Sequence, residues 1–163
     1  MSDKHSPVAP DHAWIAAHIP HRGSMCLLDR VESWSDSAIA CRANSHLRAD
    51  NPLRHAGSLG IANAIEYAAQ AMAVHGALLA GDEQAPAAGF LTSVRNVRWQ
   101  RQRLDDVGGE LVVRAERLSG NELNILYDFS LHCADVLLLS GRASVMLDAA
   151  GSHTPYPTQD KTS

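Results

Sequence analysis

The chain has 163 residues, which is enough for one domain with a proper core. Its hydrophobic content of 45% and charged content of 20% are ordinary for a globular protein. The formal net charge of −4 argues against a nucleic-acid partner.

The spacing of the cysteines and histidines limits which disulfide or metal sites the chain can form. Three cysteines lie far apart in apolar segments, without a CxxC pair: Cys26, Cys41 and Cys133. This pattern predicts buried thiols in a reducing compartment, and not a disulfide framework or a zinc site. No secretion signal is visible at the N-terminus, so the expected location is the cytoplasm. We predict no metal and no cofactor, because the closely spaced His12, His18 and His21 have no acid or cysteine partner at a ligand spacing.

A single domain is expected over 11–149, between disordered tails at 1–10 and 150–163 that are rich in Ser, Pro, Thr, Asp and Gly. It opens with a short helix that Asp11 caps and Pro20 ends. Apolar segments at 25–31 and 37–45 flank a turn and predict a β-hairpin. The polar stretch 44–57 has no periodicity and is expected to be a loop.

A long helix is predicted over 58–80, where Ala, Leu, Met, Glu and Gln dominate. Apolar residues occur on nearly every side of it, so the rest of the fold is expected to surround it. Polar residues interrupt the segment before any apolar run reaches the length of a membrane span. Gly81 is predicted to cap its C-terminal end.

Asn63, Glu66 and Gln70 form a narrow polar stripe on this helix. A carboxylate there is costly to bury unless it is paired, hydrogen-bonded or protonated. One interpretation is that Gln70, a backbone group or a distant arginine satisfies Glu66. The other is that burial raises the pKa of Glu66, so that its carboxyl group exchanges protons with a substrate.

The remaining chain predicts four strands, at 88–103, 110–118, 123–133 and 137–147. In 123–133 every odd position is apolar and most even ones are polar, which is typical of a half-buried antiparallel strand. Two strands, a long buried helix and four more strands predict an α+β hotdog fold, in which a curved antiparallel sheet wraps the helix.

Three segments resemble the bacterial 3-hydroxyacyl-carrier-protein dehydratases. IPHRGSMCLLDRV (19–31) is similar to their Leu-Pro-His-Arg opening and the Leu-Leu-Val-Asp-Arg-Val strand that follows, and IEYAAQAMA (65–73) is similar to their central helix. NPLRHAG (51–57) lies roughly where they have Gly-His-Phe-Pro-Gly. The similarity covers about 19–147 and is strongest to the predicted dehydratases of aryl-polyene pigment synthesis.

The resemblance implies that Glu66 is the catalytic carboxyl group and His55 the loop base, with His46 as the rival in the same loop. Dehydration of a 3-hydroxyacyl thioester needs one group to take the C2 proton and another to protonate the departing hydroxyl. Histidine suits the first role and a buried, protonated carboxyl suits the second.

Four further residues are expected to bind substrate: Gly57, Gly60, Gln70 and Asn63. A backbone N–H of either glycine, at the start of the central helix, is expected to stabilise the thioester oxygen. His21 and Arg22 are assigned no chemistry and are expected to hold the N-terminal segment against the sheet. His75 is expected to be a hydrogen-bonded core residue.

The run RNVRWQRQR (95–103) concentrates arginines in an otherwise acidic chain. Carrier proteins are acidic and their pantetheine arm carries a phosphate, so Arg95, Arg98 and Arg101 are predicted docking residues. A solvated edge strand that resists aggregation is the alternative.

The leading interpretation is a dehydratase that acts on acyl groups linked through pantetheine to an acyl carrier protein. An acyl thioesterase is one alternative, and a non-catalytic hotdog subunit that partners an active dehydratase is the other. The active cleft of this fold lies between two protomers, which implies a homodimer or a heterodimer with a second hotdog dehydratase.

Overall fold

The computed structural model describes residues 9–81 and 89–147. The predicted tails fall almost entirely outside these residues. The described residues form two α-helices and six strands: α1 (His12–His18), α2 (Ala64–Ala80), β1 (Arg30–Trp34), β2 (Ala38–Ala43), β3 (Gly89–Trp99), β4 (Leu111–Gly120), β5 (Asn124–Cys133) and β6 (Val136–Leu147). Short 3₁₀ turns occupy Gly23–Met25, Ser45–Leu47 and Ile61–Asn63.

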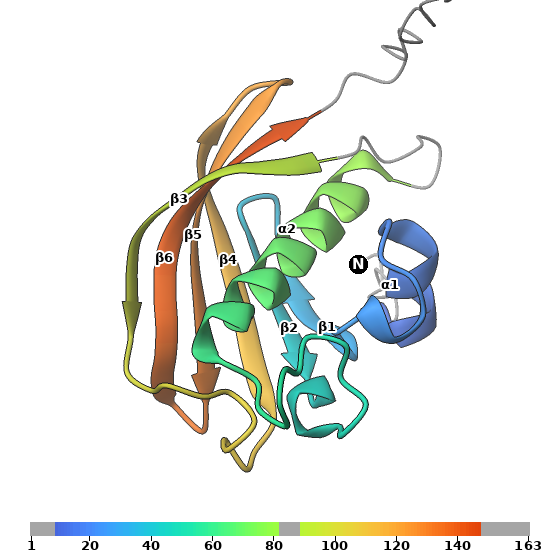
Figure 1. Cartoon of the computed structure of the whole chain (residues 1–163). Coiled ribbons are helices and arrows are strands. Elements are labelled where there is room, and N and C mark those ends of the chain that lie inside the picture. The colour runs from blue at the N-terminus through green and yellow to red at the C-terminus, as the bar shows by residue number, and fades with distance from the viewer. Residues whose placement is uncertain (1–8, 82–88, 148–163) are drawn as a thin grey trace, which may run out of the picture.

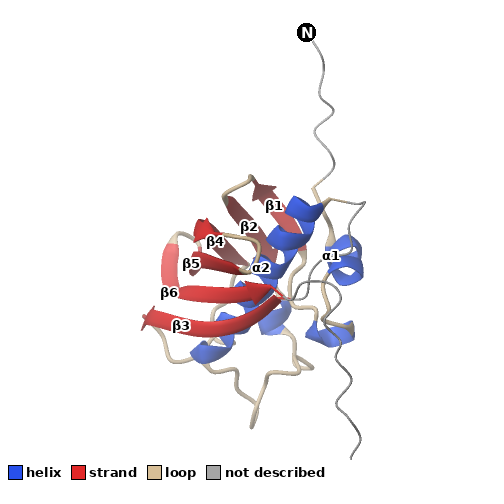
Figure 2. Cartoon of the chain, turned by 90° about the horizontal axis from the view of Figure 1, so that it is seen from above, coloured by secondary structure: helices blue, strands red, loops and turns tan. Residues whose placement is uncertain are grey.

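All six strands form one antiparallel sheet in the order β1-β2-β4-β5-β6-β3. The sheet curls around α2, and α1 covers the helix from the other side (Figure 1). The view from above shows the same curved wall with α2 in its hollow (Figure 2). This is the predicted hotdog arrangement. Three of the four C-terminal strands lie within two residues of their predicted bounds, whereas the strand predicted over 88–103 ends earlier, at Trp99.

The core lies between α2 and the inner face of the sheet. Tyr67 and Ala71 of α2 are completely buried, as is Leu131 of β5. The predicted alternation of β5 is confirmed, because Ile125, Tyr127, Phe129 and Leu131 are all buried. All three cysteines are free thiols; Cys26 and Cys41 are buried as predicted, whereas Cys133 at the end of β5 is only partly buried. No helix among the described residues is both long and apolar enough to cross a bilayer.

The central helix begins later than predicted, at Ala64 and not at Ser58. The backbone before it pairs with a distant loop instead: Gly60 bridges Arg103, and the Ile61 N–H donates to the Gln102 carbonyl at 3.0 Å. A 3₁₀ turn then leads into the helix. The predicted end is confirmed, because Gly81 caps α2 with a φ of +74°.

Two other local predictions are confirmed and one is wrong. Asp11 caps α1, since its carboxylate accepts from the Trp14 N–H at 2.9 Å. His75 is a completely buried core residue whose ring nitrogens lie 2.8 Å from the Tyr127 hydroxyl and the Ser35 carbonyl. The first strand starts at Arg30 and not at Met25, because Gly23–Met25 winds into a 3₁₀ turn.

Candidate active site

Glu66 lies in the first turn of α2 and is half-buried. Its Oε1 atom is 3.0 Å from His21 Nε2 and accepts a second hydrogen bond from Gln70 Nε2 at 3.3 Å. Because a carboxylate only accepts, His21 Nε2 carries the proton in this contact. The other oxygen, Oε2, has no hydrogen-bond partner among the described residues.

This pairing changes the expected protonation of Glu66. The hydrogen bond from His21 lowers the pKa of Glu66, burial opposes that shift, and the bond from Gln70 adds to it. The net shift is downward, so the prediction of a carboxyl group with a raised pKa is wrong for this chain. At neutral pH Glu66 is therefore a carboxylate whose Oε1 is hydrogen-bonded and whose Oε2 has no hydrogen-bond partner among the described residues.

His21 is a candidate site residue to which the sequence interpretation assigned no chemistry. It lies just after α1, in the segment where the resemblance to the dehydratases begins. Its side chain contacts Glu66 of α2. Its second ring nitrogen, Nδ1, is buried and has no hydrogen-bond partner among the described residues. A buried, unpartnered polar atom beside a half-buried carboxylate is typical of a reactive site. The Pro-His-Arg motif was the available signal.

Gln70 holds the two halves of this site together. Its side chain is completely buried. Its amide oxygen accepts from the Leu27 N–H at 2.9 Å, and its amide nitrogen donates to the Met25 carbonyl at 2.7 Å as well as to Glu66. The expected contact of Gln70 with substrate is therefore not available in this structure. Its hydrogen bonds instead fix the segment after His21 against α2.

An apolar cavity of about 470 Å³ opens at the His21–Glu66 pair. The wall on α2 consists of Ala69, Met72, Ala73 and Gly76. Facing it are the start of β3, the end of β6, two residues of β5 and the end of α1 with the segment that follows: Gly89, Phe90, Leu91, Val145, Leu147, Ile125, Tyr127, Ala17, His18, Ile19 and Pro20. The arrangement can hold an apolar chain with its reactive end beside a carboxylate.

Neither loop histidine lines this cavity. His55 is exposed and sits in a tight turn, where its N–H donates to the Ser58 carbonyl at 2.8 Å. His46 is completely buried, its Nε2 lies 3.0 Å from the Val107 carbonyl, and burial lowers its pKa. The expected pairing of either histidine with Glu66 is thus not formed within one chain, and His21 occupies that position.

The loop that carries His55 is tied to a different part of the fold. Asp105 accepts from the Leu59 N–H at 3.0 Å and lies 3.5 Å from the Arg54 guanidinium. Hydrogen bonds from Arg103 and from the Leu59 N–H lower the pKa of Asp105. These contacts hold the loop against residues 102–105, and none of its residues lines the cavity.

The other expected substrate-binding residues lie on this loop as well. Gly57 is in the exposed turn, with a φ of +74°. Gly60 precedes the 3₁₀ turn, and its carbonyl accepts from the backbone and the side chain of Asn63, both at 3.1 Å. None of the three lines the cavity, and neither glycine stands at the start of α2 as expected.

The predicted docking arginines lie along and just after β3. Arg95 pairs with Arg142 of β6 and Arg98 pairs with Ser140. A regular strand would turn Arg95 and Arg98 to opposite faces. A bulge at Asn96, which has a φ of +55°, shifts the register and places both opposite outer-face residues. Arg101 lies beyond β3, and its guanidinium is 3.7 Å from the exposed Asp106 carboxylate.

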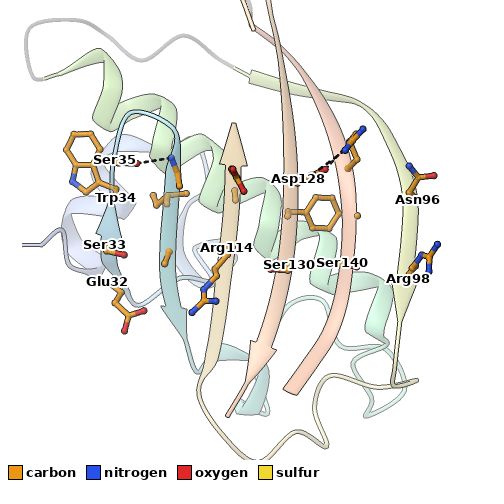
Figure 3. Close-up of a pocket in the computed structure, with 18 residues that line it drawn as sticks. Glu32, Ser33, Trp34, Ser35, Asn96, Arg98, Arg114, Asp128, Ser130 and Ser140 are labelled. Carbon is orange, nitrogen blue, oxygen red and sulfur yellow. Dashed lines mark hydrogen bonds and ion pairs between the residues drawn. The ribbon is translucent and has the colours of Figure 1, made fainter. Parts of the chain in front are cut away.

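Arg98 also borders a broad groove on the outer face of the sheet, with α2 behind the strands (Figure 3). Arg114 lies on the opposite wall, and Ser130 and Ser140 lie between the two arginines. Among the described residues, neither arginine forms an ion pair. The groove also contains Glu32, Glu116 and Asp128, so its lining is mixed in charge, and it lies on the face of the sheet away from the Glu66 cavity.

The fold and the cavity place the molecule in the hotdog class. A family model described as ApeP dehydratase matches residues 13–153, and the chain belongs to this ApeP-like family. A search of curated proteins finds no significant match.

Three solved structures illustrate the similarity. One is a chain of the dehydratase heterocomplex ApeI:P from Xenorhabdus doucetiae, with 25% identity, coverage of 83% of this chain and 91% of that one, and a TM-score of 0.74. A putative thioesterase from Silicibacter has 14% identity, coverage of 86% and 93%, and a TM-score of 0.61. PaaI of Escherichia coli has 12% identity, coverage of 83% and 88%, and a TM-score of 0.56. The last two show the fold alone.

Proposed function

We propose that this chain dehydrates 3-hydroxyacyl thioesters carried by an acyl carrier protein, with Glu66 as the reacting group. The observation that carries the proposal is the Glu66 carboxylate, which has one oxygen held by His21 and Gln70 and the other unpartnered at an apolar cavity. Membership of the ApeP-like family supports the same class of reaction.

In this proposal Glu66 Oε2 takes the proton from C2 of the substrate. The electron pair of the C2–H bond becomes the C2=C3 double bond while the C3–O bond breaks. The departing hydroxyl takes the proton from the Glu66 carboxyl group and leaves as water, which restores the carboxylate. The lowered pKa of Glu66 keeps its carboxyl group ionised at neutral pH, so Oε2 is able to accept the C2 proton.

We also propose that a second hotdog chain completes the assembly along β3. This strand is an edge of the sheet and carries three exposed apolar residues, Phe90 (57% exposed), Leu91 (41%) and Trp99 (55%). An unpaired edge with apolar side chains favours pairing with another strand. The similar ApeI:P structure is a heterocomplex of dehydratases, which supports a hetero-oligomeric partner.

Such a partner leaves a role for His55. His55 is exposed, unlike His46, and remains the proposed loop base for the cavity of a partner dehydratase, whereas Glu66 is the base in this chain's own cavity. Gly57 and Gly60 belong to the same loop and remain the proposed donors to the thioester oxygen, with Asn63 beside them.

The test of function is the loss of water from a 3-hydroxyacyl-carrier protein, followed by mass spectrometry. The isolated chain and the chain mixed with a second hotdog dehydratase are compared. We expect turnover in at least one of these samples, and it should depend on Glu66. The partner is also mixed with the Glu66→Gln variant of this chain. If that mixture gives as much product as the mixture with the unchanged chain, this chain is a non-catalytic subunit.

A second prediction concerns the carrier protein. Replacing Arg95, Arg98 and Arg101 with alanine should weaken carrier binding and flatten its dependence on salt, because ions screen the attraction. The arginines follow the cavity-lining part of β3, with Arg95 roughly 13 Å along the strand from Leu91. Binding is measured by calorimetry at several salt concentrations.

Arg48→Ala is the control for this experiment, because Arg48 is paired with Asp50 at 2.9 Å on a different surface. Its carrier affinity should match that of the unchanged protein. Equal affinity of the triple variant at low salt would leave the arginines as a solvated edge.

A further inference from the structure

The cavity runs lengthwise along α2. Its wall on the helix starts at Glu66 and continues through Ala69 and Ala73 to Gly76. Ten residues of helix separate Glu66 from Gly76, which corresponds to about 15 Å. A thioester whose C2 atom lies at Glu66 therefore has room for an extended apolar chain in the direction of Gly76.

Among the described residues, nothing requires a glycine at position 76. Glycine weakens a helix interior relative to alanine, because it loses more conformational freedom on folding. Close packing does not require it here, since a Cβ atom built on Gly76 meets no atom of the described structure within 4 Å. Its backbone is helical, so no positive φ requires it either. The space beside Gly76 belongs to the cavity.

We propose that Gly76 determines how long an acyl chain the Glu66 cavity accepts, and that the preferred substrate is a long, straight apolar acyl group. This inference rests on the proposed function for the identity of the ligand. The lining of the cavity supports it, because the strand residues that share the cavity with Gly76 are apolar or aromatic: Phe90, Leu91, Ile125, Tyr127, Val145 and Leu147. A larger side chain at Gly76 would occupy the place of the distal carbons.

The experiment measures binding of saturated acyl-pantetheine thioesters to the full-length protein, in the assembly in which it is purified. Butyryl and dodecanoyl pantetheine are compared by calorimetry. Neither carries a 3-hydroxyl group, so binding is observed without turnover. The unchanged protein should prefer the dodecanoyl thioester, because each buried methylene contributes about fourfold in affinity.

Gly76→Leu should lower dodecanoyl affinity by about tenfold or more and leave butyryl affinity unchanged. Gly76→Ala is the milder variant: it should stabilise the helix, raise Tm, and lower dodecanoyl affinity by about fourfold. Gly108→Leu is the matched control, since a Cβ atom at Gly108 also meets nothing within 4 Å but lies outside the cavity. It should bind both thioesters as the unchanged protein does.

Two results would overturn the inference: an unchanged protein without preference for the longer chain, or folded Gly76 variants that keep the full preference. A failure of the proposed function gives a different result. If the chain-length preference follows Gly76 as expected but 3-hydroxyacyl thioesters are not dehydrated, the cavity binds acyl chains for another purpose and the role of Gly76 stands.

Discussion

Glu66→Gln is expected to lower turnover by about a hundredfold or more while the protein stays folded. The amide keeps an oxygen that accepts from His21 and Gln70, so the geometry of the site is retained. It cannot take up the C2 proton, because an amide is not a base at neutral pH. Turnover is measured with the 3-hydroxyacyl-carrier protein and folding by Tm.

Glu116→Gln is the control, since Glu116 lies in the outer groove of the sheet and away from the cavity. Its turnover should be unchanged. If Glu66→Gln instead lowers Tm and keeps its turnover, the carboxylate is structural and the proposed mechanism is wrong.

His21→Ala is expected to have an effect of similar size, about a hundredfold on turnover, because it removes the donor that holds the Glu66 carboxylate. It should also change the pH profile. His21 lowers the pKa of Glu66 against the effect of burial, so its removal should raise that pKa. A base works only when ionised, and activity is lost as the pH falls through its pKa. The acidic limb of the profile should therefore move to higher pH.

Two further variants distinguish His21 from His55. His21→Gln supplies an amide donor and should restore part of the turnover that His21→Ala loses. His55→Ala should leave the chain's own site intact, because His55 does not line the cavity. If turnover falls with His55→Ala and not with His21→Ala, the acid–base pair forms between subunits.

Local patterns in the sequence predict much of this fold. The alternation of 123–133, with every odd position apolar, predicts β5, because alternate residues of a strand point to the same face of the sheet. Asp11, which caps α1, and Gly81, which ends α2, are determined by the backbone within a few residues of each. Both could therefore be identified without knowledge of tertiary contacts. Glu66 could be identified as a candidate for a similar reason, as the charged residue of a buried helix.

The rest of the site depends on contacts that no local pattern records. His21 meets Glu66 only because the chain returns after 45 residues and because Gln70 holds the intervening backbone. The late start of α2 results from pairing between Gly60 and Arg103. The common face of Arg95 and Arg98 results from a left-handed Asn96, a conformation that asparagine tolerates but does not require.

The strand order has a consequence for synthesis on the ribosome. β3 is made before β4, β5 and β6, yet its sheet partner among the described residues is β6, the last strand of the chain. Pairing between segments far apart in sequence is slow, because a long loop has to close first. One wall of the cavity at Glu66 is built from the start of β3 and the end of β6. Glu66 and α2 are therefore synthesised early, whereas the cavity beside them is complete only when residue 147 has left the ribosomal exit tunnel.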